Sequence, residues 1–96
     1  MAQYNNTASG VKTDEVIITP TGGKSVVVNI VRIVNPADSG APASLKVGGV
    51  SLITVSPGAG STRGLSLVFG FVGGVDETVT RTCPNGVTYT IQHEEV

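Results

Sequence analysis

Apolar and polar residues alternate in short runs along most of this chain, a pattern typical of β-strands with one buried face. The longest run, residues 25–35 (SVVVNIVRIVN), is apolar on both faces except at Asn29 and Arg32. A strand that is apolar on both faces is either a central strand covered on both sides or one covered by the core and by a partner. Its length favours the central strand of a sheet. Alternation divides its apolar residues between two faces, with Val26, Val28, Ile30 and Val34 on one and Val27, Val31 and Ile33 on the other.

Turn-forming residues separate the predicted strands. Gly48-Gly49 and Asn85-Gly86 each stand between two alternating runs and permit the positive φ angles of short hairpin turns. The predicted strands are residues 15–19, 25–35, 44–47, 50–53, 61–72, 77–83 and 87–93. The residues expected to face inward are Leu45, Val47, Val50 and Leu52, then Leu65, Leu67, Phe69 and Phe71, and finally Val79, Arg81, Cys83, Val87, Tyr89 and Ile91.

The spacing of these strands predicts an all-β fold. About seven or eight short strands at regular intervals are typical of a small antiparallel β-sandwich, jelly-roll-like or immunoglobulin-like. The Cys…Trp…Cys spacing of true immunoglobulin domains is absent, which favours the jelly roll. Residues 1–12 are polar and offer little to bury, so we expect an irregular N-terminal arm before a single sandwich domain over residues 13–96.

Length and composition point to oligomerisation as a source of stability. A chain of 96 residues buries a small core, and small domains usually add disulfides, metals or subunit contacts. The single cysteine, Cys83, cannot form an internal disulfide, and its inward position predicts burial as a small apolar side chain. The charged fraction is 14%, well below the roughly 25% of an average soluble domain. A surface with few charges is cheap to desolvate, which suits contact with other chains.

Charge and hydropathy exclude several classes of partner. The net charge is −1 and the six basic residues are scattered singly, so we expect no nucleic-acid binding. No apolar run approaches the roughly 20 residues that cross a bilayer, and the polar start of the chain does not resemble a signal peptide. We therefore expect no membrane partner, and synthesis and assembly in a cytoplasm.

No group of residues predicts catalysis or cofactor binding. His93 is the only histidine and lies beside two glutamates near the end of the chain. Adjacent residues on a strand point to opposite faces, so Asp76-Glu77 cannot act as a carboxylate pair on one bond. The segment 58–64 lacks the lysine and the following helix of a phosphate-binding loop. We expect no catalytic, cofactor-binding or metal-binding residues, although loop carboxylates leave calcium as an open alternative.

Polar residues on apolar strand faces are the candidates for subunit contact. Asn29, Arg32 and Arg81 interrupt such faces, and a buried polar group must be paired. Each of them therefore lies either at an exposed strand end or in contact with a partner. The polar arm is a second candidate, because such segments are often ordered by a neighbouring subunit. The full set of candidate interface residues is Tyr4, Asn5, Asn6, Lys12, Asn29, Arg32 and Arg81.

Strands and turns follow one another in a characteristic order between about residues 15 and 95. Four segments carry this order: SVVVNIVRIVNPADSGAPASLKVGGVSLI, SPGAGST, GGVDETVTRT and GVTYTIQHEEV. In this order the chain resembles a family of small bacteriophage virion proteins. The resemblance implies a phage structural protein, either a capsid decoration (cement) protein or a component of the neck or tail. Decoration proteins of this kind typically bind as trimers at local threefold positions and clamp neighbouring capsomers.

The expected function is therefore non-enzymatic. We expect a capsid decoration protein that binds the outer capsid as an oligomer, with a trimer implied by the resemblance and the major capsid protein or another virion protein as partner. The alternatives are a neck or tail component, or a receptor- or carbohydrate-binding β-sandwich module. Sugar-binding faces generally use exposed aromatic rings, for which Tyr4 and Tyr89 are the available tyrosines. The virion is the expected location.

Overall fold

The structure is a computed structural model that describes residues 2–58 and 61–96, with residues 61–69 described by their backbone. Within these residues it contains eight strands and no helix. The strands are β1 (Ala2–Thr7), β2 (Lys12–Ile18), β3 (Val26–Asn35), β4 (Ala43–Val47), β5 (Val50–Val55), β6 (Ser61–Val72), β7 (Val79–Cys83) and β8 (Thr88–Glu95).

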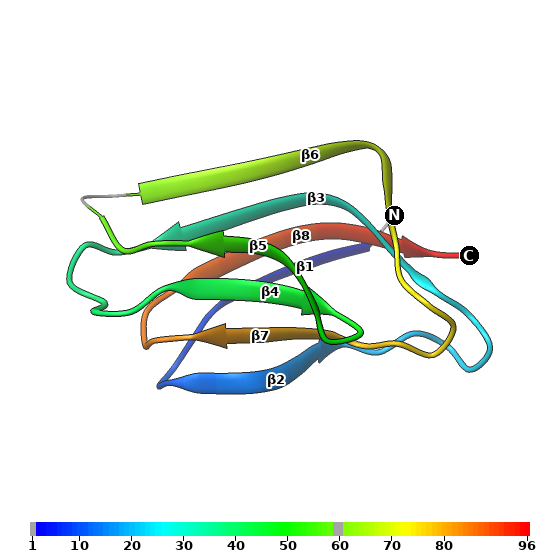
Figure 1. Cartoon of the computed structure of the whole chain (residues 1–96), viewed down its shortest axis with the longest axis horizontal. Helices are drawn as coiled ribbons and strands as arrows, with labels where there is room; N and C mark the ends of the chain where they lie inside the picture. The colour runs from blue at the N-terminus through cyan, green and yellow to red at the C-terminus, as the bar shows by residue number, and fades with distance from the viewer. Residues whose placement is uncertain (1, 59–60) are drawn as a thin grey trace.

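The strands form two antiparallel four-stranded sheets that pack face to face (Figure 1). Sheet A has the order β1-β8-β3-β6 and sheet B the order β2-β7-β4-β5. Strand β1 pairs with β8, β2 with β7, β3 with β6 and β4 with β5, as in one long hairpin. This hairpin is rolled over so that β3 also pairs with β8 and β4 with β7. Such wrapping is the jelly roll, so the predicted sandwich is confirmed in its jelly-roll form.

The core lies between the sheets and is built largely from aliphatic side chains. As predicted, Val79 and Cys83 of β7 and Tyr89 and Ile91 of β8 are buried with Val87. Strand β3 lies between β8 and β6, which confirms its predicted central position. At its end the buried Asn35 side chain donates to the carbonyls of Ala41 and Val55, which ties the following loop to β5.

A β-bulge at Asn29 changes the predicted faces of β3. Val28 pairs with His93, while Ile30 pairs with Gln92, so that Asn29 has no partner in the ladder on β8. An extra residue in one strand reverses the alternation beyond it. The core therefore receives Val26 and Val28 before the bulge but Val31 and Ile33 after it. The prediction of one continuous face for Val26, Val28, Ile30 and Val34 is wrong, and Ile30 is 42% exposed.

The predicted irregular arm is a regular strand instead. Strand β1 pairs with β8 in unbroken register, from Ala2 opposite His93 to Thr7 opposite Thr88. The segment then turns into β2, which begins at Lys12. Composition suggested an arm because the side chains of β1 have little to bury. Backbone hydrogen bonds to β8 are independent of side-chain hydropathy, and they incorporate β1 into the sheet.

The predictions of inward-facing side chains in β5 and β6 have mixed outcomes. Val50 is 61% exposed at the end of the β4–β5 hairpin, so its predicted inward position is wrong. Strand β6 is irregular opposite the β3 bulge, and Gly70 there has a φ of 77°. Phe71 packs against the core as predicted, whereas the predictions for Leu65, Leu67 and Phe69 lie outside the described side chains.

Candidate functional site

Arg81 is a charged residue buried between the two sheets. It extends inward from β7 and is only 4% exposed. Its Nε donates to Glu15 Oε1 of β2 at 2.6 Å, and its Nη2 lies 2.6 Å from the same oxygen. Lys12 Nζ lies 3.4 Å from the other carboxylate oxygen of Glu15. The hydrogen bond from Arg81 lowers the pKa of Glu15, so this carboxylate is ionised at neutral pH.

Two tyrosine rings from sheet A enclose the Arg81 guanidinium. Its central carbon lies 5.9 Å from the ring centroid of Tyr4 in β1 and 5.7 Å from that of Tyr89 in β8. These distances are within the range of cation–π attraction. The Tyr89 hydroxyl donates to the Ser44 carbonyl at 2.6 Å, and burial raises the pKa of Tyr89. We call Tyr4, Lys12, Glu15, Arg81 and Tyr89 the Arg81 cluster; it joins β1 and β8 of sheet A to β2 and β7 of sheet B.

The Arg81 cluster corrects part of the predicted interface. Arg81 is buried inside its own chain and is not available to a partner, because Glu15 already neutralises it. Tyr4 and Lys12 belong to the same cluster and are half-buried. Sequence reasoning missed Glu15, whose register position opposite Arg81 follows from the pairing of two strands far apart in the chain. For Tyr89 the sequence did contain a signal, since alternation along residues 87–93 predicted that its side chain faces inward.

Three other predicted residues, Asn5, Asn29 and Arg32, gather on the outer face of sheet A. Paired residues of neighbouring strands project on the same side of a sheet, so the strand pairs define rows across this face. We call the following rows across β1, β8 and β3 the outer A face: Gln3–Gln92–Ile30, Asn5–Thr90–Arg32 and Thr7–Thr88–Val34.

The outer A face is rich in amides and hydroxyls. Within these three rows Arg32 is the one charged residue, and Ile30 and Val34 supply aliphatic surface beside it. The next row on the same side pairs Val27 with the exposed Glu94. Thr7 and Thr88 share a hydrogen bond of 2.8 Å between their hydroxyls, which orders the face at one end. Asn29 lies at the bulge beyond the rows and donates to Glu94 at 3.4 Å. The remaining predicted residue, Asn6, is exposed on β1.

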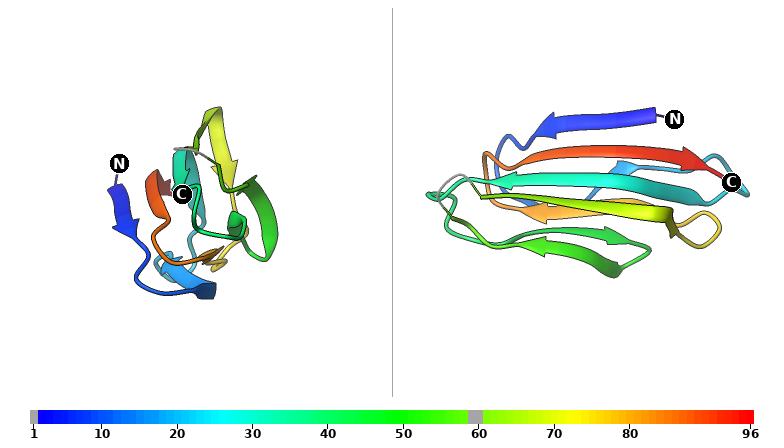
Figure 2. Two further views of the ribbon diagram at one scale, coloured as in Figure 1. Left: turned by 90° about the vertical axis from the view of Figure 1, so that its left-hand side faces the viewer. Right: turned by 90° about the horizontal axis from the view of Figure 1, so that it is seen from above.

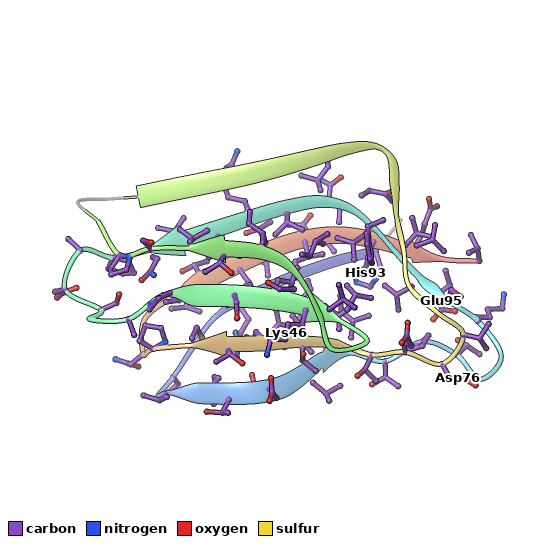
Figure 3. All side chains as sticks on the ribbon, in the orientation of Figure 1. Lys46, Asp76, His93 and Glu95 are labelled. Carbon is purple, nitrogen blue, oxygen red and sulfur yellow. The ribbon has the colours of Figure 1, made fainter. Side chains whose placement is uncertain are left out.

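Two carboxylates, Glu95 at the end of β8 and Asp76 between β6 and β7, bind the turn between β2 and β3; Figure 3 labels both residues. Glu95 accepts hydrogen bonds from the backbone amide and the hydroxyl of Thr21, at 2.9 and 3.2 Å. Asp76 accepts one from the amide of Gly23 at 2.7 Å. Both carboxylates therefore fix the turn between β2 and β3. His93 is half-buried, and burial lowers the pKa of its imidazole while the nearby Glu95 opposes that shift.

Loop carboxylates were the basis of the calcium alternative. Asp14 lies 3.4 Å from Lys46 Nζ and accepts a hydrogen bond from the Thr82 hydroxyl at 3.2 Å. Asp76 is bound to the turn described above, and Asp38 is exposed. In residues 2–58 and 61–96, no three histidine, cysteine or acidic side chains come together as a set of metal ligands.

An open hollow lies at the end of the sandwich where the loops after β1, β3 and β7 meet. Its volume is about 310 Å³, and it is lined by residues 11–13, 39–42 and 82–84. The lining is mainly apolar. Cys83 borders it but is buried, as predicted, and burial raises the pKa of the thiol. A raised thiol pKa makes the cysteine a poor nucleophile.

No helix that could cross a membrane occurs in the described part of the chain. No protein-family model and no curated protein matches this chain.

Proposed function

We propose that this chain is a non-enzymatic structural protein of a bacteriophage particle, a capsid decoration protein that binds the outer capsid as an oligomer. The observation that carries the proposal is the outer A face, which presents aliphatic, amide and hydroxyl groups around one exposed arginine. The assignment to a phage particle is based on the order of strands and turns, which resembles that of small phage virion proteins. The jelly roll is compatible with this, since the fold is common in viral capsid and lectin domains.

The composition of the outer A face favours contact with another protein. Burial of an unpaired charge is expensive, whereas amides and hydroxyls can exchange water for hydrogen bonds with a partner. The cores of protein interfaces are depleted in most charged residues but enriched in arginine. Arg32 lies on the central strand β3, flanked by Ile30 and Val34 in the neighbouring rows. This is the arrangement of a single polar anchor surrounded by surface that excludes water.

A carbohydrate- or receptor-binding module is less well supported. Stacking on a sugar ring requires an open aromatic face. Tyr89 is fully buried, and the half-buried Tyr4 ring lies over Arg81. Tyr89 offers no open ring, and Arg81 lies over one face of the Tyr4 ring, which favours the structural role. A neck or tail protein would use the same outer A face on a different virion partner.

The proposal is tested by adding purified protein to expanded phage capsids that lack it. We expect binding that saturates and that raises the temperature at which the capsids rupture. Arg32→Glu should weaken binding by tenfold or more, because a removed interface anchor costs about 1–2 kcal/mol or more. Lys24→Glu is the matched control, since Lys24 is an exposed cation in the loop before β3.

Capsid binding that is equal for Arg32→Glu, Lys24→Glu and the unchanged protein would contradict a role for the outer A face. Absence of binding to capsids, with binding to isolated tail or neck complexes, would move the protein to that part of the particle. Binding to glycans alone would refute the structural role.

A further inference from the structure

Four strands form the edges of the two sheets, and three of them are irregular. Strand β2 has two register shifts against β7, and β5 and β6 each have one against their neighbours. Strand β2 also carries charges at Lys12, Asp14 and Glu15. Bulges and charges are the usual means by which proteins stop an edge strand from pairing with another chain.

Strand β1 has neither protection. Its pairing with β8 runs without a shift from Ala2 to Thr7, and its sequence AQYNNT contains no charge and no proline. Figure 2 shows β1 as the outermost strand of sheet A, with nothing beyond it. A regular, uncharged edge leaves a row of backbone groups free to pair with another strand.

The hydrogen bonds at the end of β1 identify which of its backbone groups face outward. The Ala8 amide donates to the Val87 carbonyl at 2.8 Å, and the Ala8 carbonyl accepts from the Gly86 amide at 2.9 Å. Both backbone groups of Ala8 are thus directed toward the β8 side. Along an antiparallel strand this direction alternates with every residue. The amides and carbonyls that face the open edge therefore belong to Gln3, Asn5 and Thr7.

We propose that β1 pairs antiparallel with β1 of a second copy of this chain, with Asn5 opposite Asn5 and Gln3 opposite Thr7. In this register the outward amides and carbonyls of all three residues exchange hydrogen bonds. The two A sheets then form one continuous sheet, and a twofold axis passes beside Asn5. The outer A faces of both copies become one surface.

A second copy fits this edge because a twofold contact places like residues together. Any charge on β1 would meet its own equal across the axis, and β1 has none. The side chains of Asn5, Gln3 and Thr7 each combine donors and acceptors, so each can bond to an identical or equivalent partner. A twofold contact is also closed, and it removes the exposed edge without starting a fibre.

This inference concerns the isolated protein and does not depend on capsid binding. A twofold contact gives an even number of subunits, whereas the resemblance to phage decoration proteins implies a trimer. Measurement of the mass of the purified protein in solution distinguishes the two, and it does so whether or not the protein binds capsids.

The first experiment places charges on the axis. Asn5→Asp and Asn5→Lys should each shift the protein from dimer to monomer in sedimentation, because each puts like charges in contact. An equimolar mixture of the two should restore the dimer, which also shows that both variants are folded. Ser51→Asp is the control, since Ser51 is exposed on the uncharged edge strand β5 and should leave the dimer unchanged.

The second experiment tests the register by mild oxidation. Asn5→Cys should form a disulfide-linked dimer, because Cα atoms of such a pair lie about 5.5 Å apart, within the range of a disulfide. Gln3→Cys and Thr7→Cys should each stay unlinked alone but link when mixed. The native Cys83 is buried and does not compete. A monomeric or trimeric unchanged protein, or Gln3→Cys that links to itself as readily as Asn5→Cys, would overturn the proposal.

Discussion

Arg81 owes its buried position to contacts from three other strands. Transfer of an isolated guanidinium into a protein interior is strongly unfavourable. Here Glu15 supplies the counter-charge and two tyrosine rings supply cation–π contact. The Arg81 Nη1 donor is the one buried side-chain polar atom without a partner among the described residues. Glu15 thus offsets most of the unfavourable free energy of burying the Arg81 guanidinium.

This dependence leads to a prediction at the scale of single residues. Glu15→Ala should lower the melting temperature by about 4 °C or more, because it leaves a buried charge without a partner. The double variant Glu15→Ala/Arg81→Met should recover much of that loss, since an apolar side chain of similar length needs no counter-charge. Lys12→Ala, which removes the longer ion pair of two half-buried side chains at the rim of the cluster, should change the free energy of unfolding by less than about 1 kcal/mol. Thermal unfolding followed by circular dichroism measures all three.

If the double variant were no more stable than Glu15→Ala, the unpaired charge of Arg81 would not destabilise the folded protein. In that case water would have to solvate the guanidinium in the folded protein.

At the scale of elements, the bulge in β3 and the irregular part of β6 form one feature. Gly70 lies in β6 with a φ of 77°, a conformation that side chains with a Cβ rarely adopt. A Cβ added there would lie 2.5 Å from Val27 Cγ1 and 2.8 Å from Asn29 Oδ1. Position 70 therefore requires glycine, since a Cβ there would overlap Val27 and the bulged residue Asn29.

We therefore expect Gly70→Ala to destabilise the protein by about 1–3 kcal/mol, from overlap and from the unfavourable φ. Gly22→Ala is the matched control, because Gly22 is exposed, has no positive φ, and a Cβ there would meet nothing within 4 Å. Urea unfolding compares the two. An equal effect of both substitutions would contradict the fit between β6 and the bulge.

At the scale of the whole molecule, two carboxylates link folding to pH. Hydrogen bonds from Arg81 lower the pKa of Glu15, and hydrogen bonds from Thr21 lower the pKa of Glu95. In the unfolded chain both groups return toward the ordinary glutamate value of 4.5. The unfolded chain therefore binds protons at a higher pH than the folded one. The stabilisation is complete above about that value and is lost as the pH falls through the lowered pKa values.

We expect the melting temperature to fall as the pH is lowered from 5 toward 2. Glu15→Gln should be less stable than the unchanged protein at pH 7, because Arg81 loses its counter-charge. The difference should shrink with acidification, since protonation of Glu15 removes the same interaction in the unchanged protein. A constant difference from pH 7 to pH 2 would rule out this origin of the acid sensitivity.

Much of the fold follows from the sequence. Alternation and turn residues located the strands from residue 15 onward, the Gly48-Gly49 hairpin turn and the inward phase of β7 and β8, because these are properties of neighbouring residues. The hairpin predicted at Asn85-Gly86 is wrong, because this turn joins β7 of sheet B to β8 of sheet A, and the two strands do not pair. The absence of a helical period and the regular spacing predicted the sandwich. The sequence also identified the polar interruptions at Asn29, Arg32 and Arg81, although it could not tell buried from exposed ones.

Tertiary structure decided what depends on distant segments. Strand β1 has too few apolar residues to be recognised, and it exists because β8 offers it a row of backbone groups. Glu15 neutralises Arg81 because β2 lies beside β7, a pairing of segments far apart in the chain. The bulge at Asn29 reverses the faces of β3, since β6 and Gly70 leave room for it. Local pattern thus determined the strands and their turns, while the pairing of distant strands determined which polar residues are buried and which surfaces stay free.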